Sequence, residues 1–159
     1  MKNFVIILLI TNIFSFEQGN IISVELIESE TQLQIQAELE STIGQFGVVA
    51  QYGGDIYKII YETLDGFGDS TVASGVIGIP ITENEAFGIL SWQHGTQIYR
   101  DGVLSNNGFD ILSRVVVTSG YIFVASDYLG LGVSNDVHPY IIKESSAISV
   151  IDMIRATRN

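Results

Sequence analysis

The sequence predicts an α/β fold built on a mixed, mostly parallel sheet that opens with an antiparallel hairpin and carries helices on both faces. Two runs rich in β-branched and aromatic residues, 55–63 and 71–81, flank the glycine-containing segment 65–69, which is typical of a hairpin turn. Short apolar strands then alternate with helical patterns along the chain, in the order strand 87–92, helix 109–117, strand 121–126 and helix 144–158.

Length and composition limit the classes of function. The chain has 159 residues, enough for one domain with its own core. Its formal net charge of −11 gives no basic surface for nucleic acid or anionic lipid. The sequence contains no cysteine, so disulfides and cysteine-ligated metals are excluded.

Residues 1–19 have the layout of a secretory signal peptide. Lys2 precedes an apolar run over residues 4–10, and polar residues follow at 17–20. Ser15 and Gly19 are the two candidate cleavage positions. The run is too short and too interrupted for a stable membrane span, although a membrane anchor or a buried strand is the alternative interpretation. We therefore expect a secreted or periplasmic protein.

Residues 20–54 are expected to form an N-terminal extension ahead of the main domain, 55–159. A short strand is predicted over 21–27. Ser29 and Thr31 can each cap the start of a helix, whose apolar spacing continues to Ile43. Gly44 is expected to end that helix.

The main domain carries four further expectations. Phe87 and Trp92 are expected to pack in the core, as strand residues usually do. Residues 97–108 are polar and glycine-rich, so they are expected to form a loop over a site. A second long loop, 127–140, follows the strand 121–126. The last helix is expected to pack through the apolar positions that share one of its faces, Ala147, Ile148, Ile151 and Ile154.

The most informative motif is His94-Gly95-Thr96, which directly follows the strand 87–92. Glycine lets the backbone turn tightly, and the amide N–H groups after such a turn can point at a ligand oxygen. Acyl-transfer enzymes stabilise the oxyanion of a tetrahedral intermediate in this way. Asp127-Tyr128 follows another strand, and ligands gather at the carboxyl ends of strands in such folds. A plain strand-to-loop turn is the alternative.

These pieces, in this order, resemble the secretory-lipase-like family of α/β-hydrolases over residues 55–158. The resemblance rests on an opening hairpin with Tyr61-Glu62-Thr63 and Ala73-Ser74-Gly75, and on the later motifs His94-Gly95-Thr96, Gly120-Tyr121, Ala125-Ser126-Asp127-Tyr128-Leu129-Gly130-Leu131-Gly132 and His138-Pro139-Tyr140. It implies a partial α/β-hydrolase fold and, for a longer parent protein, a serine esterase or lipase that acts on carboxylic esters. Within that resemblance, the backbone N–H groups of Gly95 and Thr96 supply part of the oxyanion hole.

The sequence departs from the family pattern in one respect. The nucleophile of that fold sits in a Gly-x-Ser-x-Gly elbow, and its triad follows in the order serine, acid, histidine. No such elbow occurs in the sequence, so the resemblance places the triad beyond Asn159 and predicts that this chain alone is inactive. His94, Asp127 and Tyr128 are then interpreted as structural support for the site, and His138 as part of its rim.

No cofactor or metal is expected. His94 and His138 have no metal-ligand spacing, and the oxygen-bearing residues Asp101, Asn106, Asn107 and Asp110 do not match a calcium-binding loop. The expected partner is a small-molecule or lipid ester, bound by the parent protein. Two other functions remain open: an exported peptidase of the same fold, and a non-catalytic binding or structural module on that scaffold.

Overall fold

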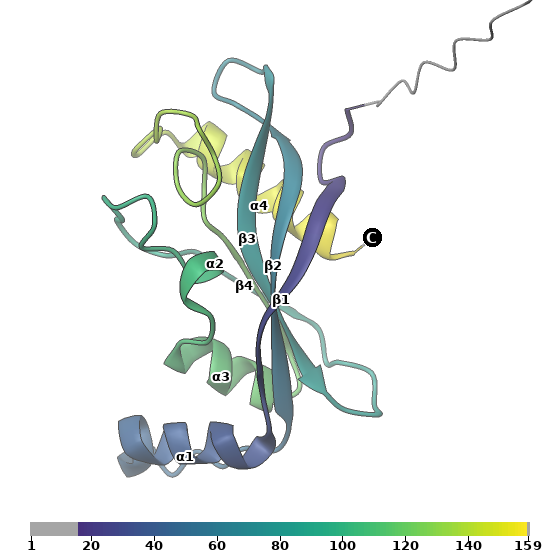
Figure 1. Ribbon diagram of the computed structural model, residues 1–159, viewed down its shortest axis with the longest axis vertical. Helices are drawn as coiled ribbons and strands as arrows, with labels where there is room; N and C mark the ends of the chain where they lie inside the picture. Colours follow the sequence, from purple (N-terminus) through teal and green to yellow (C-terminus); the bar gives the residue numbers. More distant parts are fainter. Residues whose placement is uncertain (1–15, 159) are drawn as a thin grey trace, which may run out of the picture.

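The computed structural model describes residues 16–158, so most of the predicted signal peptide, residues 1–15, lies outside the described residues. A five-stranded sheet has the order β1-β2-β3-β5-β4. Its strands are β1 (Ile21–Glu30), β2 (Gly53–Leu64), β3 (Ser70–Ile81), β4 (Ile89–Trp92) and β5 (Ile122–Ser126). The α-helices are α1 (Gln32–Ile43), α2 (Leu104–Asn107), α3 (Ile111–Thr118) and α4 (Lys143–Thr157), with a 3-10 turn, η1, at Gly44–Phe46. Figure 1 shows their arrangement.

The N-terminal elements form as the sequence predicts. Thr31 caps α1 through a capping box with Gln34, in which each residue's side chain bonds the other's backbone N–H. Gly44 is the C-cap, but the chain continues into η1 before Gly47 takes the left-handed conformation, with φ 64°. The predicted hairpin is also present, because β2 and β3 pair antiparallel over their whole length, from Gly53–Ile81 to Leu64–Ser70.

The sheet is mixed, as predicted, but its described part is not mostly parallel. Three of its four strand pairs, β1–β2, β2–β3 and β3–β5, are antiparallel. Only β4 and β5 run parallel, which is possible because α3 provides the crossover between them. The mostly parallel sheet was expected because strands alternate with helices in the second half of the chain. The strands β1, β2 and β3 have no helical crossover between β2 and β3 and pair antiparallel, so antiparallel pairs outnumber parallel ones among the described residues.

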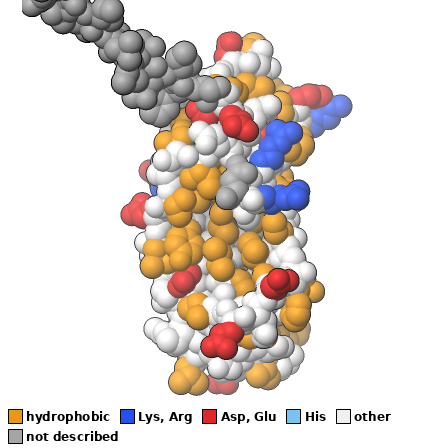
Figure 2. Space-filling view, turned by 90° about the vertical axis from the view of Figure 1, so that its right-hand side faces the viewer, with side chains coloured by type: hydrophobic (Ala, Val, Ile, Leu, Met, Phe, Trp, Pro, Cys, Tyr) orange, Lys and Arg blue, Asp and Glu red, His pale blue; other side chains and the backbone are white. Residues whose placement is uncertain are grey.

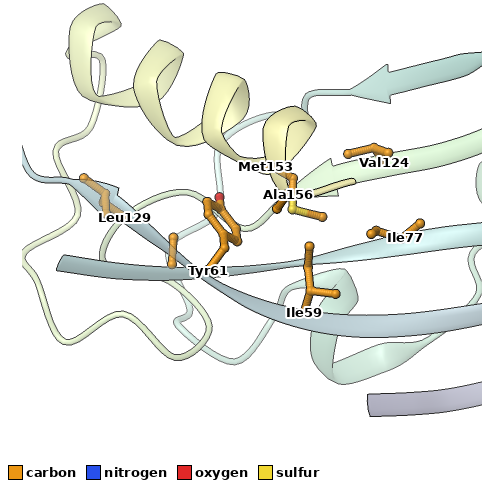
Figure 3. Packing of buried hydrophobic residues seen from close by; sticks show 8 residues of the cluster. Ile59, Tyr61, Ile77, Val124, Leu129, Met153 and Ala156 are labelled. Carbon is orange, nitrogen blue, oxygen red and sulfur yellow. The ribbon is translucent and has the colours of Figure 1, made fainter. Parts of the chain in front are cut away.

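Helix α4 covers one face of the sheet. Figure 3 shows Met153 and Ala156 of this helix against Tyr61, Ile77 and Val124 of the strands. The expectation for its packing face is wrong: Ala147 and Ile151 are exposed, and Ile148 and Ile154 are only half-buried. The inner face instead carries small and polar residues beside Met153, namely Ser145, Ser149, Asp152 and Ala156. The small side chains let the helix lie close to the sheet, and the Asp152 carboxylate accepts a hydrogen bond from the hydroxyl group of Thr63 in β2.

Helices α2 and α3 lie on the other face, so the prediction of helices on both faces is confirmed, and α1 packs against α3 near the end of the sheet (Figure 1). Val116 and Val117 of α3 pack with Phe123 of β5 in a second apolar cluster. Arg114 of α3 donates two 2.8 Å hydrogen bonds to the carboxylate of Glu30 in β1. This bidentate pair ties the helix to the far edge of the sheet.

Strand β4 is the edge of the described sheet, and this position corrects the expectation for Phe87 and Trp92. Phe87 precedes the strand and is 68% exposed, with its ring edge-on to Tyr121. Trp92 is 40% exposed. An edge strand has a neighbour on one side only, so its side chains are less covered than those of β5, which pairs on both sides.

Part of the α4 face of the sheet is uncovered. The register places Val24 opposite Ile59 and Ile79 opposite Asp55, on the side to which α4 packs. Exposed apolar residues on this side are Val24, Leu26, Ile79, Ile81 and Ile89, and Figure 2 shows hydrophobic side chains gathered across the middle of the face seen from the β1 edge. We call these five residues the bare apolar face.

The segment 97–108 is a loop with one helical turn, α2, inside it. This turn was not predicted, because four residues are too few to establish a helical period. Within residues 16–158, no helix has the length and apolar character needed to cross a bilayer.

Candidate functional site

The two motifs predicted at strand ends meet in space. Strands β4 and β5 run parallel with Trp92 beside Ala125, so both chains leave the sheet at the same edge. His94 Nε2 lies 3.2 Å from the main-chain oxygen of Asp127, and the His94 and Tyr128 rings are 4.5 Å apart. The site is therefore built from the carboxyl ends of adjacent strands, where α/β folds place their ligands.

Both nitrogens of the His94 ring lie near main-chain oxygens, and a neutral imidazole donates a hydrogen bond to one of them. Nδ1 is 2.8 Å from the oxygen of Gly95, and Nε2 is within hydrogen-bond distance of Asp127 O. These contacts pin the ring between the two loops. The ring thereby contacts the backbone of the Gly95 turn and of the 127–140 loop, and the supporting role expected from the sequence stays a prediction.

The amides of Gly95 and Thr96 border a cleft of about 240 Å³. Among the described residues, neither N–H has a hydrogen-bond partner. The cleft is also lined by Trp92, Val103 and Asp127. A backbone donor beside a cleft and without an internal partner is free to bond an oxygen of a ligand.

Asp127 is a buried carboxyl group, only 1% exposed. Ser74 of β3 donates a 2.6 Å hydrogen bond to its Oδ2, and the same hydroxyl accepts from the N–H of Val133. Burial raises the pKa of Asp127, although hydrogen bonding to neighbouring serines opposes this effect. Ser74 is a site residue that sequence reasoning did not single out for this role; a polar residue on the inward side of an apolar strand was the available signal.

A chain of hydroxyl groups supports the start of the 127–140 loop. Tyr61 is fully buried, and burial raises its pKa, so its hydroxyl is neutral and donates to the main-chain oxygen of Ser149 at 2.8 Å. The Ser126 hydroxyl, 2.8 Å from Tyr61 Oη, then donates to it and accepts from the N–H of Tyr128. Tyr128 is thereby held at φ 66°, a left-handed conformation uncommon for a residue with a side chain.

Two glycines of the 127–140 loop are required by close approaches. Gly130, at φ 76°, lies against the backbone of His138, and Gly132, at φ 57°, lies against the side chains of Ser74 and Asp127. A Cβ atom at either position would collide with these groups. The His138 ring bonds the main-chain oxygen of Leu129 at 2.8 Å, so His138 holds the rim of the loop.

Two of the residues considered as calcium ligands, Asp110 and Asn106, serve other roles. Asp110 caps α3 by accepting from the N–H of Ser113 at 2.7 Å. Asn106 accepts from the Lys58 ammonium group at 2.7 Å. Within residues 16–158, no three histidine or acidic side chains come together as metal ligands would.

With this geometry described, solved structures define the class of fold. The chain has a partial α/β-hydrolase fold, and its neighbours are esterases and lipases of that fold. No protein-family model matches the sequence, and the comparison with curated proteins gives no match.

Three solved structures illustrate the likeness. The rice cell wall degrading esterase LipA from Xanthomonas oryzae is 31% identical, with TM-score 0.78, over 89% of this chain and 37% of that one. A hydrolase from Legionella pneumophila is 30% identical, with TM-score 0.76, over 87% of this chain and 38% of that one. Candida antarctica lipase A in its closed state is 17% identical, with TM-score 0.57, over 91% of this chain and 32% of that one. At this identity the likeness shows only a common fold. The chain thus spans less than two fifths of the length of each.

Proposed function

We propose that this chain is the N-terminal portion of a secreted or periplasmic serine hydrolase that cleaves carboxylic esters, and that it supplies half of the oxyanion hole through the amides of Gly95 and Thr96. The observation that carries the proposal is the pair of unpartnered N–H groups at the cleft beyond β4. Structural likeness to an esterase from Xanthomonas oryzae at 31% identity supports the ester substrate class, and likeness to a hydrolase from Legionella pneumophila at 30% identity supports a hydrolytic reaction.

In the proposed reaction, a serine outside the described residues attacks the ester carbonyl carbon, and the electron pair of the C=O double bond moves to its oxygen. The amides of Gly95 and Thr96 bond that oxyanion, while a base takes the serine proton and passes it to the departing alcohol. Water then adds to the acyl-enzyme and releases the acid. One such donor typically contributes about 3 kcal/mol to transition-state stabilisation.

His94, Asp127 and Tyr128 are positioning residues in this proposal. The His94 ring ties the Gly95 turn to the start of the 127–140 loop, and Ser74 fixes the Asp127 carboxyl group behind it. None of the three is assigned to the triad, because the family order places acid and histidine after the missing serine.

Export through residues 1–19 is part of the proposal. Of the two candidate cleavage positions, the contacts favour Ser15 over Gly19. Gly19 N–H donates to the main-chain oxygen of Glu62, and Glu62 N–H donates to that of Asn20, so residues 17–20 extend the pairing of β1 with β2. Cleavage after Gly19 would remove part of this contact. Mass spectrometry of the exported protein gives its N-terminal residue.

The test compares two polypeptides: the 159-residue chain, and the complete gene product that continues past Asn159. The complete product is expected to hydrolyse p-nitrophenyl acetate and to lose activity after treatment with a serine-directed phosphonate. The 159-residue chain is expected to show no serine-dependent turnover. Turnover by the short chain, or a gene that ends at Asn159, would contradict the fragment assignment. A complete product that cleaves peptides but not esters would favour the peptidase alternative.

A further inference from the structure

A groove of about 660 Å³ adjoins the cleft at the Gly95 turn, and Thr96 and Gln97 line both. The groove lies between the segment 96–100 and the 127–140 loop, and its volume is within the range of small-molecule sites. A ligand whose oxygen bonds the amide of Thr96 therefore has this groove as its neighbouring space. The groups that line the groove decide which chemistry such a ligand can carry.

Arg100 brings an unpaired positive charge to the groove. Among the described residues that line it, Arg100 is the only lysine or arginine. Its guanidinium makes a single long hydrogen bond, 3.4 Å to the main-chain oxygen of Asp136. Within residues 16–158 it forms no ion pair, whereas Arg114 and Arg155 each pair with a carboxylate. Most of its five N–H donors are therefore free to bond a ligand.

The carboxylate of Asp136 does not neutralise this guanidinium, although Asp136 also lines the groove. Its Oδ2 accepts hydrogen bonds from the hydroxyl groups of Thr71 and Ser134, at 2.7 and 3.1 Å. Arg100 bonds the main chain of Asp136, but the two side chains form no ion pair. The acidic group beside the groove is thus engaged by hydroxyl groups, and the cation is left for a ligand.

The backbone of Arg100 is fixed relative to the opposite wall of the groove. Gly132 N–H donates to the main-chain oxygen of Arg100 at 2.9 Å, and Gly130 packs against the backbone of His138. Only four residues separate Arg100 from Thr96, so their Cα atoms are at most about 14 Å apart. One small molecule can therefore contact both the amide of Thr96 and the guanidinium.

The surroundings of Arg100 favour a carboxylate as its partner. Ile98, Leu131 and Val137 line the same groove, and an ion pair beside apolar side chains is less screened than one on an open surface. The two oxygens of a carboxylate match the planar fork of a guanidinium. A doubly charged phosphate is repelled more strongly by a chain whose net charge is −11.

We propose that Arg100 binds a carboxylate group of the ester substrate, so that the enzyme prefers esters with a free carboxylate over neutral esters of the same shape. This inference rests on the proposed function, since Gly95 and Thr96 set the position of the ester carbonyl group. The carboxylate belongs either to the acyl part or to the alcohol part of the ester, and its chemistry at Arg100 is the same. Arg100 determines specificity and takes no part in acyl transfer.

The kinetic test gives the complete gene product two matched pairs of esters and follows the released acid in a pH-stat. Monoethyl adipate against ethyl adipamate places the carboxylate or its neutral amide in the acyl part. The pair 6-acetoxyhexanoate and 6-acetoxyhexanamide places it in the alcohol part. In one pair kcat/KM is expected to be about tenfold higher for the carboxylate, and that pair identifies the part of the ester that Arg100 binds. Values that are equal within both pairs, or lower for the carboxylate, would overturn the proposal.

Two substitutions of Arg100 separate a specific ion pair from attraction by general charge. Arg100→Gln removes the charge and is expected to lower the carboxylate-to-carboxamide ratio of kcat/KM to about one. Arg100→Lys keeps the charge without the planar fork, so its ratio is expected to lie between those of Arg100→Gln and the wild type. Both variants keep the main-chain oxygen that accepts from Gly132.

Lys143→Gln is the matched control, because it also removes one positive charge. The Lys143 side chain is 89% exposed and does not line the groove, so the ratio is expected to equal that of the wild type. A ratio that survives in Arg100→Gln, or that falls equally in Lys143→Gln, would overturn the assignment to Arg100.

A binding measurement separates failure of this assignment from failure of the proposed function. The keto acid 7-oxooctanoate has a carbonyl oxygen and a carboxylate but no cleavable ester bond. It is titrated into the complete gene product while the NMR signal of the Arg100 Nε–H group is followed. Saturable shifts with 7-oxooctanoate, and none with the neutral 7-oxooctanamide, are expected even if no ester is hydrolysed. Ester hydrolysis without these shifts would overturn the role of Arg100 and leave the proposed function standing.

Discussion

The hydroxyl group of Thr63 in β2 donates a 2.8 Å hydrogen bond to the buried carboxylate of Asp152 in α4, 89 residues later. Arg155 donates to the other carboxylate oxygen at 2.6 Å, and the Gln18 amide donates to Oδ2 at 3.3 Å. Helix α4 is therefore anchored to the sheet through a buried polar group as well as through Met153 and Ala156. The position of this helix fixes the oxygen of Ser149, which accepts from Tyr61 below the site.

Replacing Asp152 should destabilise the fold. Asp152→Ala leaves Thr63 and Arg155 without their acceptor, and hydrogen bonds to a charged group contribute about 1.5–3 kcal/mol each. We expect the free energy of unfolding of the complete gene product to fall by about 2–4 kcal/mol, measured by urea denaturation. Asp101→Ala, at an exposed aspartate, is the control and should change it by less than about 0.5 kcal/mol. A smaller effect at Asp152 than at Asp101 would contradict the anchoring role.

Removing the Tyr61 hydroxyl should weaken the site more than the fold. Tyr61→Phe deprives Ser126 of its acceptor and leaves the oxygen of Ser149 unbonded, at a cost of about 1–3 kcal/mol. Because Ser126 holds the N–H of Tyr128, we also expect kcat for p-nitrophenyl acetate to fall. Tyr99→Phe, at a 72% exposed tyrosine, is the matched control. Unchanged kcat with lowered stability would restrict Tyr61 to a structural role.

The raised pKa of Asp127 predicts a pH dependence of stability. The folded protein holds this proton more tightly than the unfolded chain, whose pKa is near 3.8. The contribution of Asp127 is therefore fully present below that pH and is lost as pH rises through the folded pKa. Between pH 3.8 and the folded pKa, the wild type should lose stability while Asp127→Asn does not, so the free energy of unfolding of the variant rises relative to that of the wild type. Above the folded pKa, the difference between the two free energies should stay constant. Urea denaturation at several pH values measures this difference. If the difference is independent of pH, or changes in the opposite direction, burial does not raise the pKa of Asp127.

The open edge of β4 predicts self-association of the 159-residue chain. Among the described residues β4 has no neighbour beyond β5, and the bare apolar face lies on the same sheet. Unpaired strand edges beside apolar surface promote aggregation. We expect the short chain to be poorly soluble or partly folded, and Leu90→Lys to reduce its association during size-exclusion chromatography. A monomer with a sharp two-state melting transition would contradict this.

Local signals were sufficient for much of the fold. The capping box at Thr31 and the turn at 65–69 involve residues within a few positions of each other, so the sequence predicts α1 and the hairpin directly. Strands β4 and β5 were also predictable, and with them the meeting of His94 and Asp127 at one edge. The roles assigned to Gly95 and Thr96 stay predictions.

Features that depend on distant partners were not predictable. The edge position of β4 follows from its pairing, which exposes Trp92 although its sequence is apolar. Helix α4 turns Asp152 inward, where its carboxylate accepts a hydrogen bond from Thr63, and Tyr61 donates to the main-chain oxygen of Ser149. Apolar periodicity selects Ile151 instead, because it carries no information about these partners. Ser74 was overlooked as a partner of Asp127 for the same reason, since 53 residues separate them.

The most direct test of the oxyanion assignment compares two substitutions at Thr96 in the complete gene product. Thr96→Pro removes the amide N–H, whereas Thr96→Ala keeps it and removes only the hydroxyl group that bonds Tyr140. We predict that kcat for p-nitrophenyl acetate falls about 100- to 1,000-fold in Thr96→Pro and far less in Thr96→Ala, while both variants keep the wild-type melting temperature. Equal kcat in the two folded variants would contradict the assignment.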